Sequence, residues 1–285
     1  MSKVRPYIAL MKLRVVELLL VTTLPALFLA SGGVPPLGIT IATLLGGTLA
    51  AGASNAFNMI IEVDSDRLMA RTAKRPIVTG TVSETQAFIF ASILTLISLT
   101  VFSIFTTLLA TILTAAAIVF YVFGYTIGLK RRTSQNIVWG GIAGCMPVLI
   151  GWSAITNSLS LSAWLFFLVI FFWTPPHFWA LAVKYRDDYA TAGIPMLPVV
   201  ASIKSVKKQM WFHTIGMIVT SIGVNWSANL PWWCWAVTVA LALGFGLQLL
   251  KIDGPDSNKA AAKLFQWSIT YLSVFSLLLV VATLI

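Results

Sequence analysis

The sequence predicts an all-α, polytopic membrane protein that forms a single domain over residues 1–285. Of these 285 residues, 58% are hydrophobic and only 10% are charged. The mean hydropathy of +0.91 excludes an ordinary soluble domain. The apolar residues form long unbroken stretches, whereas a membrane barrel would show segments of roughly ten residues with alternating polarity. Helices that cross the bilayer are therefore the expected structure.

Nine stretches are long enough to cross a bilayer as helices, which takes about 20 apolar residues each. Most of them are apolar around the whole helix, so each would be surrounded by lipid or by other helices. We therefore predict nine transmembrane helices. In chain order they cover residues 15–31, 37–60, 86–105, 108–127, 137–155, 161–183, 211–227, 231–250 and 264–285.

The charged residues predict one orientation for these spans. All 19 Lys and Arg lie in the N-terminal arm or in alternate connections, at 61–85, 128–136, 184–210 and 251–263, and the nine acids lie on the same side. The remaining connections carry no charge. The positive-inside rule then places the N-terminus and the charged loops in the cytoplasm and the C-terminus outside. Because the cations are divided among membrane loops, nucleic-acid binding is not expected.

The first span and the cysteines add two smaller expectations. Lys12, Arg14 and Glu17 lie late for a cleaved signal peptide, and eight further spans follow, so we expect this helix to be retained. No Ser- and Arg-rich transit segment precedes it, which favours the plasma membrane. Cys145 and Cys234 each lie in an apolar span, which indicates packing rather than a disulfide or metal site.

A polar cluster follows the second span. Asn58, Glu62 and Asp66 recur every four residues, so their oxygens would lie along one stripe of a helix. Mg²⁺ takes oxygen ligands and usually binds one or two side chains together with substrate phosphates. The stripe predicts a magnesium–diphosphate site in which these three residues are metal ligands and catalytic. The alternative is a solvated loop, which would explain the neighbouring cations but not the acids.

Basic residues near the stripe are candidates to bind the diphosphate. Arginine can hold phosphate oxygens in a fork, and lysine supplies a compact charge. Pro76 directly follows Arg75 and should end any helix that continues from the stripe. Without a diphosphate site, the run of three basic residues at 130–132 would serve only to orient the protein in the membrane. The predicted diphosphate-binding residues are Arg67, Arg71, Arg75, Lys130 and Arg131.

Two further candidate sites are an acid pair that follows the sixth span and a histidine that lies within it. Asp187 and Asp188 could hold a second Mg²⁺, or they could be solvated; both interpretations stay open. Pro175 and Pro176 should interrupt the helical hydrogen bonds and open the backbone at membrane depth. His177 follows them and is a catalytic candidate, since ionisable residues in membrane spans are often functional. A histidine that only packs between helices is the alternative.

These segments resemble the UbiA-type intramembrane prenyltransferases, and in particular the branch that modifies haem. The pattern Asn58-x3-Glu62-x3-Asp66, with Arg71-Thr72 and Arg75-Pro76, is similar to the first motif of the family. Two more segments agree, so the resemblance covers roughly residues 5–200. Met59 stands where an acid is common, and Glu62 stands where an Asp is common, which leaves the number of metal ions open. The two further segments are YTIGLKRRTSQNIVWGGIAG and FFWTPPHFWALAVKYRDDYATAGIPMLPVV.

The resemblance implies nine helices around a central cavity that opens toward the cytoplasm and the lipid. It also implies Mg²⁺-dependent transfer of a farnesyl group from farnesyl diphosphate to a vinyl group of haem B. The implied partners are these two substrates, the lipid bilayer and, as a further candidate, a haem-processing or oxidase protein. A quinone-type enzyme that prenylates a phenolic acceptor is the nearest alternative. A secondary transporter fits less well, because its ionisable groups would lie near the bilayer midplane.

Overall fold

The computed structural model describes residues 4–285, except for the side chains of Arg14, Val15 and Leu18. Within this part of the chain the regular structure is entirely helical, which confirms the all-α prediction. Lys3 and the Arg14 side chain, which contribute to the predicted orientation, lie outside the described residues. The fold is that of a multi-pass membrane protein.

A helix covers all or nearly all of each predicted span, and short helices connect some of them at one end. The π-helix η1 continues α6 without a break. The long helices are α2 (Leu13–Ser31), α3 (Leu37–Ile61), α5 (Glu84–Phe105), α6 (Leu108–Val119), η1 (Phe120–Leu129), α7 (Asn136–Thr156), α8 (Leu161–Lys184), α11 (Ile203–Ser227), α12 (Trp232–Leu250) and α13 (Ser257–Ala282). The short ones are α1 (Arg5–Met11), α4 (Val63–Leu68), α9 (Arg186–Thr191) and α10 (Leu197–Val200).

The predicted count of nine spans is not confirmed. Among the described residues, seven helices are long and apolar enough to cross a membrane: α3, α5, the continuous segment Leu108–Leu129, α7, α8, α12 and α13. In the part of α2 that follows Leu18, where every side chain is described, Leu19–Ser31 forms a shorter apolar helix. The helix α11 does not qualify, because His213, Asn225 and several hydroxyl side chains lower its hydropathy.

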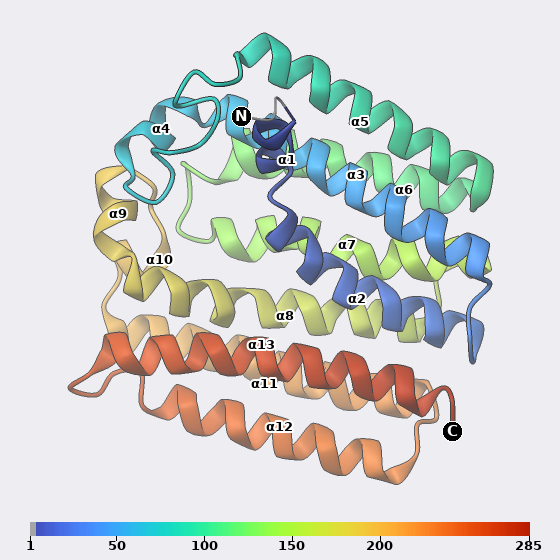
Figure 1. Ribbon diagram of the computed structural model, residues 1–285. Helices are drawn as coiled ribbons and strands as arrows, with labels where there is room; N and C mark the ends of the chain where they lie inside the picture. Colours follow the sequence, from blue (N-terminus) through green and yellow to red (C-terminus); the bar gives the residue numbers. More distant parts are fainter. Residues whose placement is uncertain (1–3) are drawn as a thin grey trace.

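The helices run side by side, with the short helices gathered at one end (Figure 1). That end holds α4, α9 and α10 and the connections that carry the charged residues. The opposite end holds the connections α2–α3, α5–α6, α7–α8 and α11–α12, and the C-terminus (Figure 1). All the predicted site residues except His177 belong to the first end, so the fold brings loops distant in sequence into one region.

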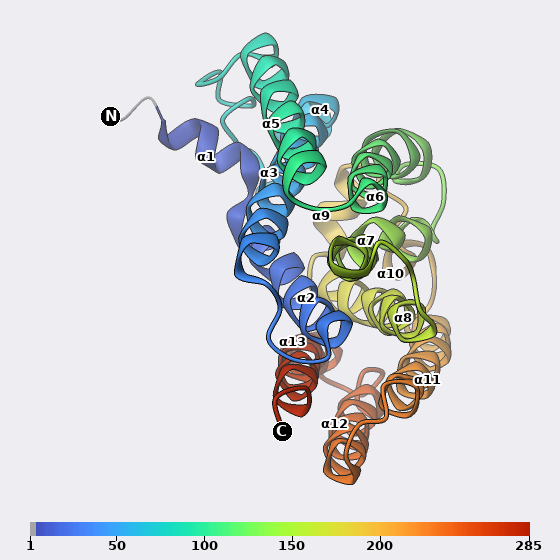
Figure 2. The ribbon, with the colours of Figure 1, turned by 90° about the vertical axis from the view of Figure 1, so that its right-hand side faces the viewer.

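The helix α8 lies at the centre of the packing. It contacts α7, α11 and α13, and the view along the helices shows it between them (Figure 2). Phe166, Val169 and Trp179 on α8 are fully buried. By contrast, large apolar side chains of α5, α6 and α12, such as Leu96, Leu108 and Leu243, are exposed, as expected where helices face lipid.

The two prolines of α8 behave differently from the prediction. We expected Pro175 and Pro176 to open the backbone, but α8 continues through both without a break. Membrane helices tolerate proline where neighbouring helices and Ser or Thr side chains compensate the lost bonds; here the Thr174 hydroxyl donates to the Ile170 carbonyl at 2.7 Å. Pro198 also lies within a helix, because it occupies the first turn of α10 (Leu197–Val200).

Candidate active site

The predicted acid stripe is helical across a junction between two helices. The amide of Glu62 donates to the Asn58 carbonyl at 3.0 Å, and the amide of Asp66 donates to the Glu62 carbonyl at 2.8 Å. Helical spacing is therefore kept although α3 ends at Ile61 and α4 begins at Val63. The side chains of Asn58, Glu62 and Asp66 are all buried, with 2%, 4% and 1% of their surface exposed. A solvated loop, the alternative considered for this segment, does not describe them.

Each residue of the stripe contacts a cation. Lys130 Nζ lies 2.5 Å from Glu62 Oε1, and the guanidinium of Arg75 pairs with Asp66 Oδ2. Asn58 Oδ1 accepts a hydrogen bond from Lys12 Nζ at 2.9 Å. Isolated buried carboxylates are unfavourable unless paired, so these contacts account for the two acids in this apolar surrounding.

The π-helix η1 supplies part of this site. In a π-helix the backbone bond spans five residues rather than four, and such turns are frequent at functional sites. Thr126 on η1 accepts a hydrogen bond from Asn58 Nδ2 at 3.3 Å and donates to the Tyr121 carbonyl at 2.9 Å. The amide of Lys130 closes the last wide turn on the Tyr125 carbonyl. The end of η1 thus brings a hydroxyl and an ammonium group to the stripe.

Lys12 is a site residue that the sequence reasoning missed. In the sequence its charge fits the positive-inside pattern, and its partner Asn58 lies 46 positions away. Burial lowers the pKa of Lys12 to about 7, and repulsion by Arg75 and Lys130 acts in the same direction, while Glu62 and Asp66 oppose it. An added anion would therefore stabilise the charged form of this side chain.

The donor set fits a magnesium ion. Asp66 Oδ1 is buried and has no hydrogen-bond partner, although its neighbour Oδ2 is paired with Arg75. This unpaired carboxylate oxygen belongs to a residue one helical turn from Glu62, which is itself one turn from Asn58, and a hard cation could use it as a ligand. Among the described residues, no three Asp, Glu, His or Cys side chains form a metal-binding group by themselves. Substrate phosphates would have to complete the coordination, as is usual for Mg²⁺.

The other predicted cations lie farther from the stripe. Arg71 contacts the rings of Tyr185 and Tyr189, with its guanidinium carbon 5.9 and 5.6 Å from their centroids. Arg131 donates to the Ser65 hydroxyl at 2.9 Å. Arg67 is exposed and contacts Asp64, whose side chain is 85% exposed. Of the predicted diphosphate-binding residues, Arg75 and Lys130 therefore contact the acids directly.

The second predicted acid pair lies on α9. Tyr189 is the buried residue of this short helix, so Asp187 on another face is exposed and Asp188 is half-buried. Neither carboxylate forms a metal-binding group with other Asp, Glu, His or Cys side chains of the described chain. Their role as ligands of a second metal ion stays a prediction.

His177 lies between α8 and α13. Its ring stacks on Trp173 and Phe265, with centroid distances of 4.2 and 4.5 Å. Its Nδ1 lies 2.7 Å from the Ser268 hydroxyl, and only 5% of the residue is exposed. These are the contacts of a packing histidine, so its catalytic role also stays a prediction.

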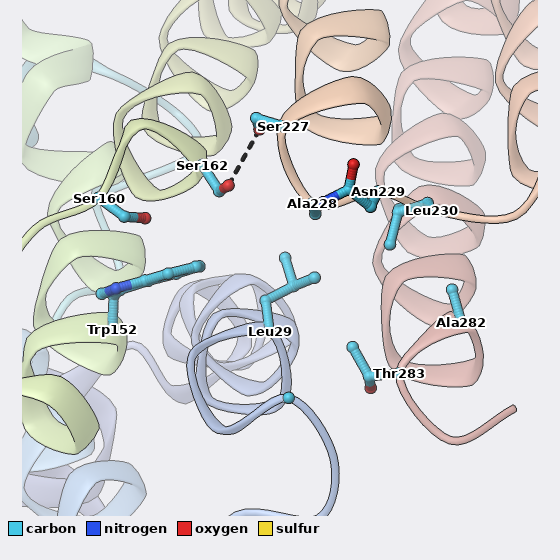
Figure 3. Close-up of a pocket in the computed structure, with 11 residues that line it drawn as sticks. Leu29, Trp152, Ser160, Ser162, Ser227, Ala228, Asn229, Leu230, Ala282 and Thr283 are labelled. Atoms are coloured by element: carbon cyan, nitrogen blue, oxygen red, sulfur yellow. Dashed lines mark hydrogen bonds between the residues drawn. The ribbon is translucent and has the colours of Figure 1, made fainter.

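A cavity of about 440 Å³ lies at the opposite end of the bundle. Hydroxyl and amide groups line it, and Ser162 donates to Ser227 at 3.0 Å across one side (Figure 3). No charged residue belongs to its lining, so it does not provide the predicted diphosphate site. The lining residues are Leu29, Gly32, Trp152, Ser160, Ser162, Ser227, Ala228, Asn229, Leu230, Ala282 and Thr283.

Comparison with solved structures shows the class of membrane protein to which this fold belongs. A digeranylgeranylglyceryl phosphate synthase has a TM-score of 0.80 at 16% identity, covering 99% of both chains. A UbiA homolog from Archaeoglobus fulgidus, bound to DMAPP and Mg²⁺, has a TM-score of 0.72 at 17% identity, covering 98% of this chain and 99% of that one. The model of the UbiA prenyltransferase family matches residues 19–269, and this chain belongs to that family.

Closer relatives share almost the full length of the chain. The Protoheme IX farnesyltransferase of Streptomyces coelicolor is 47% identical over 98% of this chain and 91% of its own length. The protein of the same name from Frankia casuarinae is 46% identical over 100% of this chain and 99% of its own length. The chain is thus an enzyme of the prenyltransferase class, and the predicted resemblance is confirmed.

Proposed function

We propose that this protein transfers a farnesyl group from farnesyl diphosphate to a vinyl group of haem B, giving haem O. The names of the relatives support the choice of substrates. The observation that carries the chemistry is the buried cluster of Asn58, Glu62 and Asp66 with three cations at one end of the helices. Three cations against two carboxylates leave a net positive charge, which suits an anionic ester.

Asn58, Glu62 and Asp66 would hold Mg²⁺, with Asp66 Oδ1 as the free ligand atom. When bound, the ion stabilises negative charge on the departing diphosphate. Burial of the three ligands limits their contact with water, and in such a setting fixed charges act more strongly than in bulk solvent.

Lys12, Arg75 and Lys130 would donate hydrogen bonds to the phosphate oxygens. They already lie on the Asn58–Glu62–Asp66 stripe, so a diphosphate next to these residues would meet charged donors that need little rearrangement. As the allylic C–O bond breaks, their positive charge offsets the charge of the leaving group. The vinyl carbon of the haem would then form the new C–C bond with the allylic cation, and water would add to the remaining carbocation and lose a proton to solvent, which leaves the hydroxyl group of haem O.

The membrane orientation proposed for the protein follows from its charges. The end that carries α4, α9 and the stripe is assigned to the cytoplasmic face of the plasma membrane, and the C-terminus to the outer face. Farnesyl diphosphate is a charged molecule with an apolar tail, so a site at the membrane edge can bind its diphosphate while the tail lies among apolar helices. A haem-processing or oxidase protein is the proposed recipient of the product.

The test is production of farnesylated haem in membranes that contain this protein and no related activity. The membranes are incubated with farnesyl diphosphate, Mg²⁺ and either haem B or 4-hydroxybenzoate. The products are separated by chromatography and identified by mass spectrometry. We expect the farnesylated product from haem B and none from the phenol. Prenylation of the phenol alone would replace the proposal by a quinone-type activity, and ion-coupled flux in liposomes without prenyl transfer would favour a transporter.

A further inference from the structure

The chain turns sharply where α1 meets α2, at Met11 and Lys12, which we name the elbow. Lys12 has φ 51° and ψ 55°, the left-handed conformation that residues with a side chain rarely adopt. Among the described non-glycine residues, the others with positive φ are Asn157 and Asn229, and asparagine tolerates this conformation better than lysine. A lysine in this conformation therefore needs contacts from the surrounding structure to hold it.

Those contacts come from one face of α3. The amide nitrogen Nδ2 of Asn55 donates to the Met11 carbonyl at 3.0 Å. Gly52 lies against the Met11 side chain: a Cβ added there would come within 2.7 Å of Met11 Cε and 3.0 Å of Cγ. One turn further along, Asn58 accepts the bond from Lys12. Residues three apart on a helix lie on the same face, so Gly52, Asn55 and Asn58 all contact the elbow from one face of α3.

The hydrogen bond from Asn55 to Met11 satisfies a carbonyl at the end of α1. Met11 is the last residue of α1, and the last carbonyls of a helix have no partner inside it. Asn55 is 95% buried and lies in the interior of α3, where asparagine is otherwise a poor helix former. Its side chain satisfies one of these carbonyls and at the same time fixes the position from which the Lys12 side chain leaves the backbone.

We propose that Asn55 and Gly52 are positioning residues that hold the elbow so that the ammonium group of Lys12 reaches the diphosphate site. This inference rests on the proposed function of that site. In this proposal Lys12 contacts the diphosphate of the substrate, whereas Asn55 and Gly52 act by positioning Lys12. The simpler alternative is that both residues only attach α1 to α3, in which case their loss would affect stability but not substrate binding.

The experiment measures binding of radiolabelled farnesyl diphosphate, with Mg²⁺, to the purified full-length protein in detergent. We expect Lys12→Met and Asn55→Ala each to weaken binding about tenfold, the size expected for loss of one hydrogen bond to a charged group. In the double variant we expect no weakening beyond that of Lys12→Met, because Asn55 acts through Lys12. Effects that multiply in the double variant, or unchanged binding by Asn55→Ala, would overturn the inference.

Gly52→Ala supplies a second route if Asn55→Ala does not fold. It should weaken binding because the added methyl group displaces Met11, while Gly47→Ala on the same helix should bind normally, since a Cβ there meets nothing within 4 Å. Equal binding by the two glycine variants would contradict the inference. If the wild-type protein binds farnesyl diphosphate but makes no farnesylated haem, the proposed function is wrong. The inference about the elbow would not be contradicted by that result.

Discussion

The two ends of the helical bundle are built from different chemistry. At one end, carboxylates and cations are buried together and paired at Asn58, Glu62 and Asp66. At the other end, a cavity of about 440 Å³ is lined by neutral hydroxyl, amide and apolar groups (Figure 3). The cavity therefore does not coincide with the proposed active site. Buried charged groups cost free energy in an apolar surrounding, so a cluster of them is a better indication of a functional site.

The largest expected effect would come from Asp66→Asn at the charged end. This change keeps the shape of the side chain but removes the charge that faces Arg75 and would face Mg²⁺. We expect product formation to fall by about 100-fold or more, the loss typical of removing a key electrostatic group. Haem extraction and chromatography measure it. Asp64→Asn is the matched control, because its side chain is 85% exposed; equal losses in both variants would contradict the difference between buried and exposed acids.

Lys130→Met tests whether the ion pairs serve function as well as folding. Removing Lys130 leaves Glu62 buried without its partner, and an unpaired buried charge destabilises a protein by about 3–5 kcal/mol. We expect a lower Tm and a large loss of activity. The double variant Lys130→Met with Glu62→Gln should regain most of the Tm but not the activity.

Thermal unfolding followed by fluorescence, together with the product assay, separates these two effects. Arg132→Met, at an exposed neighbouring position, should change neither quantity. Recovery of activity in the double variant would mean that Glu62 and Lys130 matter for folding alone.

A smaller effect is expected from Gly140→Ala on α7. A Cβ at Gly140 would come within 2.1 Å of the Tyr125 ring, so the ring and the adjoining end of η1 must shift. Misplacing Lys130 by a fraction of an ångström should lower activity by about tenfold. Gly144→Ala, four residues further along the same helix, meets nothing within 4 Å and should be neutral. Activity is measured as product formed per milligram of protein.

The smallest effect is expected at the neutral end. Ser162→Ala removes one hydroxyl–hydroxyl bond at the edge of the cavity of about 440 Å³. The expected loss of stability is about 1 kcal/mol or less, and product formation should be unchanged. A strong loss of activity in this variant would break the comparison, because it would give the neutral end a part in the reaction.

Much of the site could be predicted from spacing. Oxygens at positions 58, 62 and 66 share one stripe because they lie one helical turn apart, and the structure keeps that turn across the junction of α3 and α4. The sequence could not reveal that Lys12 belongs to the same site, because its partner Asn58 is 46 positions away. It also could not choose between the two interpretations of His177, since the stacking rings come from α8 and α13.

The sequence by itself determined the all-helical membrane fold, the side on which the charges gather and, apart from Lys12, the residues proposed to bind a metal ion and a diphosphate. These properties depend on hydropathy and on local helical spacing, which neighbouring residues set. Only the tertiary structure decided which cation contacts which oxygen: Lys130 pairs with Glu62 and Arg75 with Asp66, while Arg67 is left in contact with exposed Asp64. Such pairings depend on how helices pack and where loops meet, because charges interact strongly only when burial brings them within a few ångströms of one another.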